Sequence, residues 1–524
     1  MTRFLVERDS NLHAVGMQGT SDPNAELLDA AALCGHLIPE GSVHAFLALH
    51  RKELFPDDLF EDLFPSGRGR PSVPADVIAS VMVLQALEGL SDRDALRRLR
   101  TDIAWKVACG LSLSDEGFHP TVLTLWRNRL RASERPQRIF YAVREVIAAT
   151  GVLKGRDRRA LDSTVLDDAV ATQDSVMQLV TAIRRVRRVI PQAKTVSLDA
   201  HDYDNDAGKP SCAWDDTAAR EALITAMVGD ADRLIDACPE DGLDQEQSEA
   251  LGLLALIAGQ DVEPGQGEGT WRIAFRTAPG RIVSAVDPEA RHIHKSVHSY
   301  RDGYKAHFAV EPETGLITAC QLTPGSTPDG PIGLALLEAE TKSMEVLADS
   351  AYGSGEVRAA LEEAGHRQTI KPITLRRHIP GGFTKDDFAI DLDAATVTCP
   401  AGQTVVITPK LHATFGVRCR GCPLRSRCTT ASGGKTINLT PNERHLQQAR
   451  IRAREPDYIE TYRSKRPMVE RSIAWFTARG HRKVRYRGTE RNQFFVHTRS
   501  AAINLRRLLQ LGLQRQERAW LLAT

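Results

Sequence analysis

The stretch Met344-Glu-Val-Leu-Ala-Asp-Ser-Ala-Tyr-Gly-Ser-Gly355 is apolar at its start and rich in turn-forming residues at its end. Its first five residues predict a short buried strand that ends at Asp349. A helix over Glu356–Ala364 and a further strand over Gln368–Pro372 are predicted next. This order is typical of a mixed α/β sheet, which binds ligands at the carboxyl ends of its strands. Asp349 lies at such an end.

Other strand signals extend this sheet in both directions along the chain. Arg159–Leu166 predicts a short strand, and Asp302–Val310 with Leu316–Leu322 predicts a hairpin around the turn at Glu313-Thr-Gly315. A helix is expected over Ile332–Lys342. The fold class is therefore α/β, with a mixed sheet at the centre of the chain.

Helical patterns dominate residues 1–150 and return in a helical insertion at about 170–265, which includes Val176–Ile190. Ser91 and Asp94 form a capping-box pattern that predicts the start of a helix at Asp92. Four N-terminal helices are expected, namely Ala75–Leu90, Asp92–Leu99, Ala104–Gly110 and Thr121–Leu130. Short helices that carry arginines suit a helix-turn-helix DNA module, but they also suit an ordinary helical bundle. The candidate DNA-binding side chains are Arg93, Arg97, Arg98, Arg127 and Arg129.

The composition is that of a globular protein with an uneven charge. The chain has 524 residues, which predicts two or three domains, and a net charge of only +1. Its segment 440–524 nevertheless holds 19 Lys and Arg against 7 Asp and Glu, which favours a polyanionic partner or a solvated helical surface. The N-terminal residues show no signal-peptide core, and the longest apolar stretches are too short to span a bilayer, so a cytoplasmic location is expected.

Three carboxylates are the candidate catalytic residues. Asp162 interrupts the apolar strand around it, Asp349 ends another strand, and Glu470 follows Pro467 in the first turns of a predicted helix. Burying a carboxylate is costly unless a cation or hydrogen-bond donors meet it, although each acid alone could simply be capped or ion-paired. Phosphodiester cleavage needs such hard oxygen ligands for Mg²⁺ or Mn²⁺. Asp167 and Asp168 compete with Asp162 as the first acid, but they lie beyond the apolar part of the strand.

Four ordered motifs connect these acids. They are Leu161-Asp-Ser-Thr164, Gly303-Tyr-Lys-Ala-His307, Leu347-Ala-Asp-Ser-Ala-Tyr-Gly353 and Tyr462-x-x-x-Arg-Pro-x-Val-Glu-Arg471. In this order they resemble the DDE transposases of bacterial insertion sequences, in the branch with a Tyr/Arg/Glu signature. Three N-terminal segments resemble the helical domain of the same group, namely Gly67–Pro74, Gly89–Ala95 and Thr121–Leu130.

The resemblance implies a ribonuclease-H-like catalytic domain over residues 155–510, after a DNA-binding domain over residues 1–150. It implies that Asp162, Asp349 and Glu470 hold the metal and that Arg466 is a catalytic residue whose planar fork matches phosphate oxygens. Tyr462 lies four residues before Arg466, whereas the signature spacing is three. The implied partners are double-stranded DNA, as transposon terminal inverted repeats and target DNA, and a second copy of the chain that pairs two ends. A transposase of this kind would associate with the nucleoid.

Further candidate DNA contacts are Lys305 and His307, which alternate to one strand face, and Lys465. The competing interpretation of the first two is a surface hairpin. Asp329 is interpreted as nothing more than the N-cap of the helix that follows it.

A cysteine cluster lies in a Cys-rich insertion at about 380–440. Four of the nine cysteines gather there, namely Cys399, Cys419, Cys422 and Cys428. Cys-x-x-Cys with two flanking cysteines can bind Zn²⁺ tetrahedrally, and a metal would stabilise a short, loop-rich segment. A cluster without metal is the alternative.

These features together predict an enzyme that binds the ends of its insertion sequence, hydrolyses DNA there and joins the freed 3′-hydroxyl to target DNA. The alternatives are a metal-dependent nuclease without strand transfer, and a transposase-derived DNA-binding protein that no longer catalyses. The sequence does not specify the end sequence or the target preference.

Overall fold

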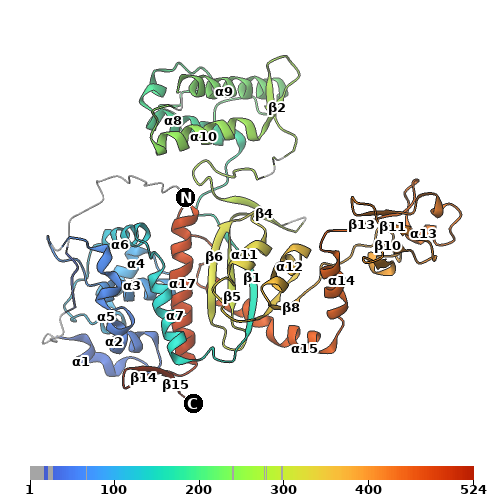
Figure 1. The fold of residues 1–524 in the computed structure, drawn as a ribbon. Coiled ribbons are helices and arrows are strands. Elements are labelled where there is room, and N and C mark those ends of the chain that lie inside the picture. Colours follow the sequence, from blue (N-terminus) through green and yellow to red (C-terminus); the bar gives the residue numbers. More distant parts are fainter. Residues whose placement is uncertain are drawn as a thin grey trace.

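A six-stranded mixed sheet forms the centre of the computed structural model (Figure 1). The structure describes residues 17–21, 28–66, 68–238, 241–276, 278, 280–296 and 299–523. The expected helical character of residues 1–16 and 22–27 lies outside these residues. Strands run in the order β4-β5-β1-β7-β8, and β6 also pairs with β5. Their bounds are β1 Arg158–Asp167, β4 Arg291–Ser296, β5 Ser299–Val310, β6 Ile317–Pro324, β7 Glu345–Ala348 and β8 Arg367–Ile370.

The register of the central strands places two acids side by side. β1 runs antiparallel to β5, with Asp162 opposite Phe308, and parallel to β7, with Ala160 opposite Leu347. Two residues further along, where β7 has ended and β1 continues, Asp162 and Asp349 come level. The predicted hairpin and both predicted strands of the β7–β8 unit are confirmed within a few residues.

Four helices flank the sheet, namely α11 Asp329–Ala335, α12 Gly355–Glu363, α16 Pro467–Thr477 and α17 Thr489–Gln510. The prediction of a helix over Ile332–Lys342 is wrong at both ends. The helix begins three residues earlier, directly after Pro328, whose ring fixes a conformation suited to a helix start. It ends at Ala335 because the next amides form turns, and Glu340 is held by an ion pair with Arg159.

The N-terminal helices pack on the opposite side of α17 from the sheet (Figure 1). They are α1 Ala30–Cys34, α2 Val43–Leu54, α3 Ala75–Glu88, α4 Asp92–Thr101, α5 Ile103–Cys109, α6 Thr121–Ala132 and α7 Arg138–Thr150, with 3₁₀ turns η1 Gly35–Leu37 and η2 Asp57–Leu63. The buried Arg499 of α17 donates to the carbonyls of Ala86 and Leu87 at the end of α3. One hydrophobic core therefore runs from these helices through α17 to the sheet.

A helical unit with its own core lies between β1 and β4 (Figure 1, top). It comprises α8 Ser175–Val189, η3 Pro191–Thr195, α9 Thr217–Ala237, α10 Gln245–Gln260 and the short strands β2 Val262–Pro264 and β3 Trp271–Ile273. Gln173 and Asp261 tie its base together through bonds to Ser284, Ser175 and Arg281.

Between β8 and α14, the chain forms a small module with a core of its own (Figure 1, right). It contains η5 Lys385–Asp387, β9 Ala389–Asp391, β10 Thr396–Thr398, β11 Thr404–Val406, β12 His412–Thr414, η6 Gly416–Cys419, α13 Arg425–Cys428 and β13 Thr436–Asn438. Helices α14 Glu443–Arg452 and α15 Pro456–Lys465 lead back to the sheet.

The chain ends in the hairpin β14 Leu513–Gln516 and β15 Ala519–Leu522, which packs on α7. Trp520 of this hairpin contacts Phe46 of α2 at 5.5 Å between ring centroids. Within the described residues, no helix combines the length and the apolarity needed to cross a membrane.

Candidate active site

Asp162 lies in the middle of β1, with 17% of its side chain exposed. Its Oδ1 accepts a hydrogen bond from the Ser163 amide at 2.8 Å, and its Oδ2 lies 2.9 Å from Nη2 of Arg466. Burial raises the pKa of Asp162, the nearby Asp349 charge raises it further, and Arg466 lowers it. A cation close to this carboxylate would therefore be bound favourably.

Asp349 follows β7 and caps the 3₁₀ turn η4 Ser350–Tyr352. Its Oδ1 accepts from the Ala351 amide at 2.9 Å. This bond leaves the other carboxylate oxygen, Oδ2, unused by the cap. The ring of Tyr352, which lies in this turn, is buried in the core and packs closely on Gly333 of α11. A larger residue would not fit at position 333, because an added Cβ would lie 2.7 Å from the ring.

Arg466 connects the first acid with the third. Its side chain is 7% exposed, and its Nη1 lies 3.2 Å from Oε1 of Glu470, one helical turn away. Glu470 itself is 67% exposed on the first turn of α16. Since α16 packs on β1 and β5, the helix delivers Arg466 and Glu470 to the edge where Asp162 and Asp349 lie.

The three candidate acids do not converge on a common metal-binding position. Throughout the described ranges, no group of three or more His, Cys, Asp or Glu side chains is close enough to hold a metal ion. Asp162 and Asp349 lie side by side, whereas Glu470 points to solvent and the guanidinium of Arg466 occupies the space between Glu470 and Asp162.

The rival first acids are engaged elsewhere. Asp167 pairs with Arg301 at 3.0 Å. Asp168 is buried against Asp287, and burial together with the Asp287 charge raises the pKa of Asp168 to about 6. Neither forms an ion pair with Arg466 among the described residues.

Lys305 and His307 share one face of β5, and both turn toward Asp329. Lys305 Nζ lies 3.2 Å from Asp329 Oδ2, and His307 Nδ1 lies 3.4 Å from Asp329 Oδ1. His307 is fully buried, donates to or accepts from Thr323 at 2.9 Å, and burial lowers its pKa to about 4. The interpretation of Asp329 as an N-cap is wrong, because Pro328 is the cap residue and no side chain caps α11.

Sequence reasoning missed Tyr352. Its hydroxyl is buried near Ser163, and its pKa is raised by burial and by the charges of Asp329, Asp162 and Asp349. Tyr352 is thus near enough to Asp329 and to two of the candidate acids for their charges to act on it. The only signal in the sequence is its position three residues after Asp349.

Tyr462 lies near the acids despite its shifted spacing. Burial raises its pKa, and the charges of Arg466, Asp349, Asp162 and Glu470 all act on it. The α-helix explains this, because a residue four positions before Arg466 lies on the same helical face. Lys465, the adjacent candidate DNA contact, is bound to Glu313 at 3.1 Å.

The candidate arginines of the N-terminal helices fall into two groups. Arg93 is exposed on α4 and forms no ion pair with the described residues, while Arg97 and Arg98 are exposed and pair with Asp94 and Asp102. Two arginines of α6 instead face the protein. Arg127 is buried and binds Asp92 at 2.7 Å, and Arg129 lies over the Phe64 ring at 4.6 Å.

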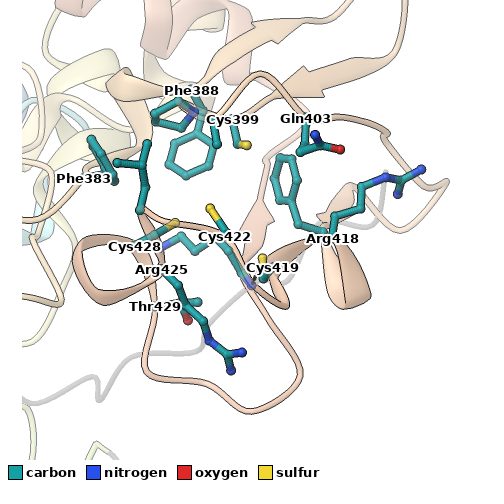
Figure 2. A pocket seen from close by; sticks show the side chains of 15 residues that line it. Phe383, Phe388, Cys399, Gln403, Arg418, Cys419, Cys422, Arg425, Cys428 and Thr429 are labelled. Carbon is teal, nitrogen blue, oxygen red and sulfur yellow. Dashed lines mark hydrogen bonds between the residues drawn. The ribbon is translucent and has the colours of Figure 1, made fainter.

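The four clustered cysteines line one small cavity in the module between β8 and α14 (Figure 2). Cys399, Cys419, Cys422 and Cys428 direct their sulfur atoms toward it, and Phe388 and Phe415 also line it. The cavity measures about 20 Å³, room for a single small species. Burial raises the pKa of Cys428, and the three other thiols raise it further.

Two family models match the chain. The family described as "Transposase DDE domain" matches residues 398–509, which include Arg466 and Glu470. The family described as "Transposase domain (DUF772)" matches residues 37–129, which span α2 to most of α6. Neither a curated protein nor a solved structure matches significantly.

The mixed sheet and the helical N-terminal region fit a DDE transposase, the class to which both matching family descriptions point. The two matches together support a DDE-type insertion-sequence transposase, and the DDE domain family implies an enzyme that cleaves DNA and transfers its strands.

Proposed function

We propose that this transposase binds the ends of its insertion sequence and cleaves them with a divalent metal held by Asp162, Asp349 and Glu470. The observation that carries the proposal is the level pairing of Asp162 and Asp349 on parallel strands. The strand sequence β6-β5-β1-β7-β8, antiparallel up to β1 and parallel beyond it, is the arrangement expected of a ribonuclease-H-like core.

The donor chemistry fits Mg²⁺ or Mn²⁺. Two carboxylates that repel one another, one of them with a raised pKa, supply hard oxygens and a local excess of negative charge. The bound metal would supply charge neutralisation and an activated water at the scissile phosphate. Glu470 is exposed and four residues from Arg466, so a change of its side-chain rotamer alone could bring it toward the pair.

In this proposal the residues around the three acids position them and bind the phosphate. Arg466 holds Asp162 and Glu470 through separate nitrogens, and its fork also suits a phosphate. The Ser163 and Ala351 amides fix one oxygen of each paired acid. The burial of Tyr352 keeps the acids' inner side free of bulk water.

A strand-transfer assay tests the proposed function. Full-length protein with end-containing DNA, target DNA and Mg²⁺ should yield joined products. Cleavage without joining would indicate the nuclease alternative. Binding without cleavage would indicate a DNA-binding protein, and in both cases the proposal fails. Two copies are proposed to act together, since two ends must be brought to one target.

Helices α4 and α6 are proposed to contribute to DNA recognition, with the exposed Arg93 contacting DNA. We expect Arg93→Ala to weaken binding to end DNA without changing the melting temperature, because this side chain makes no ion pair with the described residues. Arg127→Ala should instead destabilise the fold by about 2 kcal/mol, since the Asp92 carboxylate and the Gln85 amide oxygen lose the guanidinium that donates to them. Electrophoretic shifts and thermal melts measure the two effects. Equal effects of both variants on binding, with no melting change, would contradict this division.

The four clustered cysteines are proposed to bind one structural Zn²⁺. The support is their shared cavity and the influence of three thiols on the pKa of Cys428. The side chains would have to close in further, because the described residues contain no preformed metal group.

Metal analysis should find about one zinc per chain. Cys422→Ser should remove most of it and make residues 383–439 sensitive to protease, since the module's own core is small. Cys212→Ser is the matched control, because Cys212 lies outside the module and should leave the zinc content unchanged. Zinc-free wild-type protein that resists protease equally well would contradict the proposal.

A further inference from the structure

A large open groove begins beside the candidate acids and extends toward the cysteine module. It has a volume of about 1090 Å³ and lies between the segment after β8 and helices α14 and α15. We call it the basic groove, and its principal lining residues are Lys371, Ile373, Arg377, Tyr458, Tyr462 and Arg463.

The groove lining holds five Lys and Arg side chains against the two acids Asp386 and Asp387, so its net charge is positive. Lys371, Arg377 and Arg463 form no ion pair within the described ranges of the chain, and all three are exposed. Two other arginines of the lining, Arg450 and Arg454, are bound to Asp386 at 2.6 and 3.0 Å. The three exposed cations without an ion pair are thus available to an anionic ligand in the groove.

Aromatic rings form the wall of the groove nearest the acids. Tyr458 and Tyr462 are stacked one turn apart on α15, with ring centroids 6.1 Å apart and planes inclined by 6°. Tyr458 is buried and supports Tyr462, which is only partly covered. Opposite, Ile373 exposes 48% of its surface at the groove.

The groove is continuous with the candidate active site. The Lys371 amide donates to the Ala348 carbonyl at 3.0 Å, which fixes Lys371 beside Asp349. The charges of all three candidate acids act on the pKa of Tyr462, whose main cause of change is burial. A phosphate chain that passes the acids therefore meets Lys371 and Tyr462 next.

We infer that the basic groove binds single-stranded DNA, the strand that continues from the phosphate held at the acids. The inference rests on the proposed function of that site. Unpaired cations along a channel suit a phosphate backbone, and an aromatic wall suits an unstacked base. In a duplex both faces of each base are covered by neighbours, so this wall would have no base to receive. The groove would therefore separate one strand locally at the cleavage point.

The first test compares two adjacent arginines. Full-length protein is titrated, without metal, into a short fluorescent oligothymidylate and into a short duplex of arbitrary sequence, at several salt concentrations. Arg377→Ala should weaken oligothymidylate binding and flatten its salt dependence by about 0.7 of a unit, as expected for one lost phosphate contact. Arg376→Ala is the control, because Arg376 is exposed in the same loop but does not line the groove.

The second test separates the tyrosine ring from its hydroxyl. Tyr462→Ala should weaken oligothymidylate binding about tenfold, whereas Tyr462→Phe should bind like the wild type. Thermal melts of both variants verify that they are folded, and Arg377→Ala provides the test if Tyr462→Ala is not. Unchanged oligothymidylate binding by the groove variants, or equal losses from Arg376→Ala and Arg377→Ala, would overturn the inference. So would equal weakening of duplex and single-strand binding, which would make the groove a duplex path.

These measurements require no catalysis. If strand transfer fails but the groove variants lose single-strand binding, only the proposed function is wrong. If strand transfer succeeds and the groove variants bind normally, only the inference is wrong.

Discussion

Asp349→Asn should abolish Mg²⁺-dependent cleavage while leaving DNA binding nearly intact. The substitution removes a negative oxygen from the pair formed by Asp162 and Asp349, so the remaining ligands cannot neutralise the cation as before. We expect a loss of roughly three orders of magnitude or more in the cleavage rate. Asp162→Asn and Glu470→Gln should have losses of the same size. Single-turnover cleavage of labelled end DNA measures the rate, and electrophoretic shifts measure the binding.

The double variant of Asp162 and Asp349 should be little worse than either single variant, because residues that act as a unit are not additive. Asp167→Asn is the matched control. Asp167 ends the same strand but pairs with Arg301, so its loss should leave most of the cleavage activity. Appreciable cleavage by Asp349→Asn, or complete loss in Asp167→Asn, would rule out the proposed set of acids.

Arg466→Ala should lower the cleavage rate about a hundredfold and move its pH dependence toward higher pH. Burial and Asp349 raise the pKa of Asp162, and Arg466 is the group that opposes them. Without the guanidinium this pKa rises further, so a higher pH is needed before the carboxylate is ionised and able to bind a cation. The activity lost at acidic pH should therefore be partly recovered at alkaline pH.

Arg466→Lys separates the charge of the side chain from its geometry. A lysine retains one positive charge but cannot hold Asp162 and Glu470 through two nitrogens of a planar fork. Its pH profile should stay near that of the wild type, while its maximal rate remains reduced. Cleavage rates measured across pH at saturating metal provide the comparison. An Arg466→Ala profile that keeps its shape, or moves toward lower pH, would contradict the role assigned to Arg466.

Local patterns in the sequence predicted most of the elements correctly. The apolar runs before Asp349 and around Asp162 gave β7 and β1, and Ser91 caps α4 as its pattern indicates. Such signals lie within a few residues of one another, where propensity and capping act. The convergence of Asp162 with Asp349 was anticipated only through the resemblance, because strand order is not encoded locally.

Contacts between distant segments explain what the sequence did not reveal. Asp329 looked like a helix cap, but its partners Lys305 and His307 lie on strand β5, more than twenty residues away. Arg127 looked like a DNA contact because arginines usually face solvent, yet it binds Asp92 and Gln85 across two other helices. The basic groove likewise combines residues near 371 with residues near 458, and no spacing rule predicts that neighbourhood.

The position of α17 bears on how the chain folds during its synthesis. This helix is translated about four hundred residues after α3, yet it completes the hydrophobic core of the N-terminal helices. Nascent domains usually fold in order from the amino terminus. Here the N-terminal helices cannot bury their apolar faces fully until about four hundred further residues have been translated. Until then these faces remain available to chaperones. We therefore expect that chains truncated before Thr489 accumulate as aggregates or degradation products rather than as competing DNA-binding fragments.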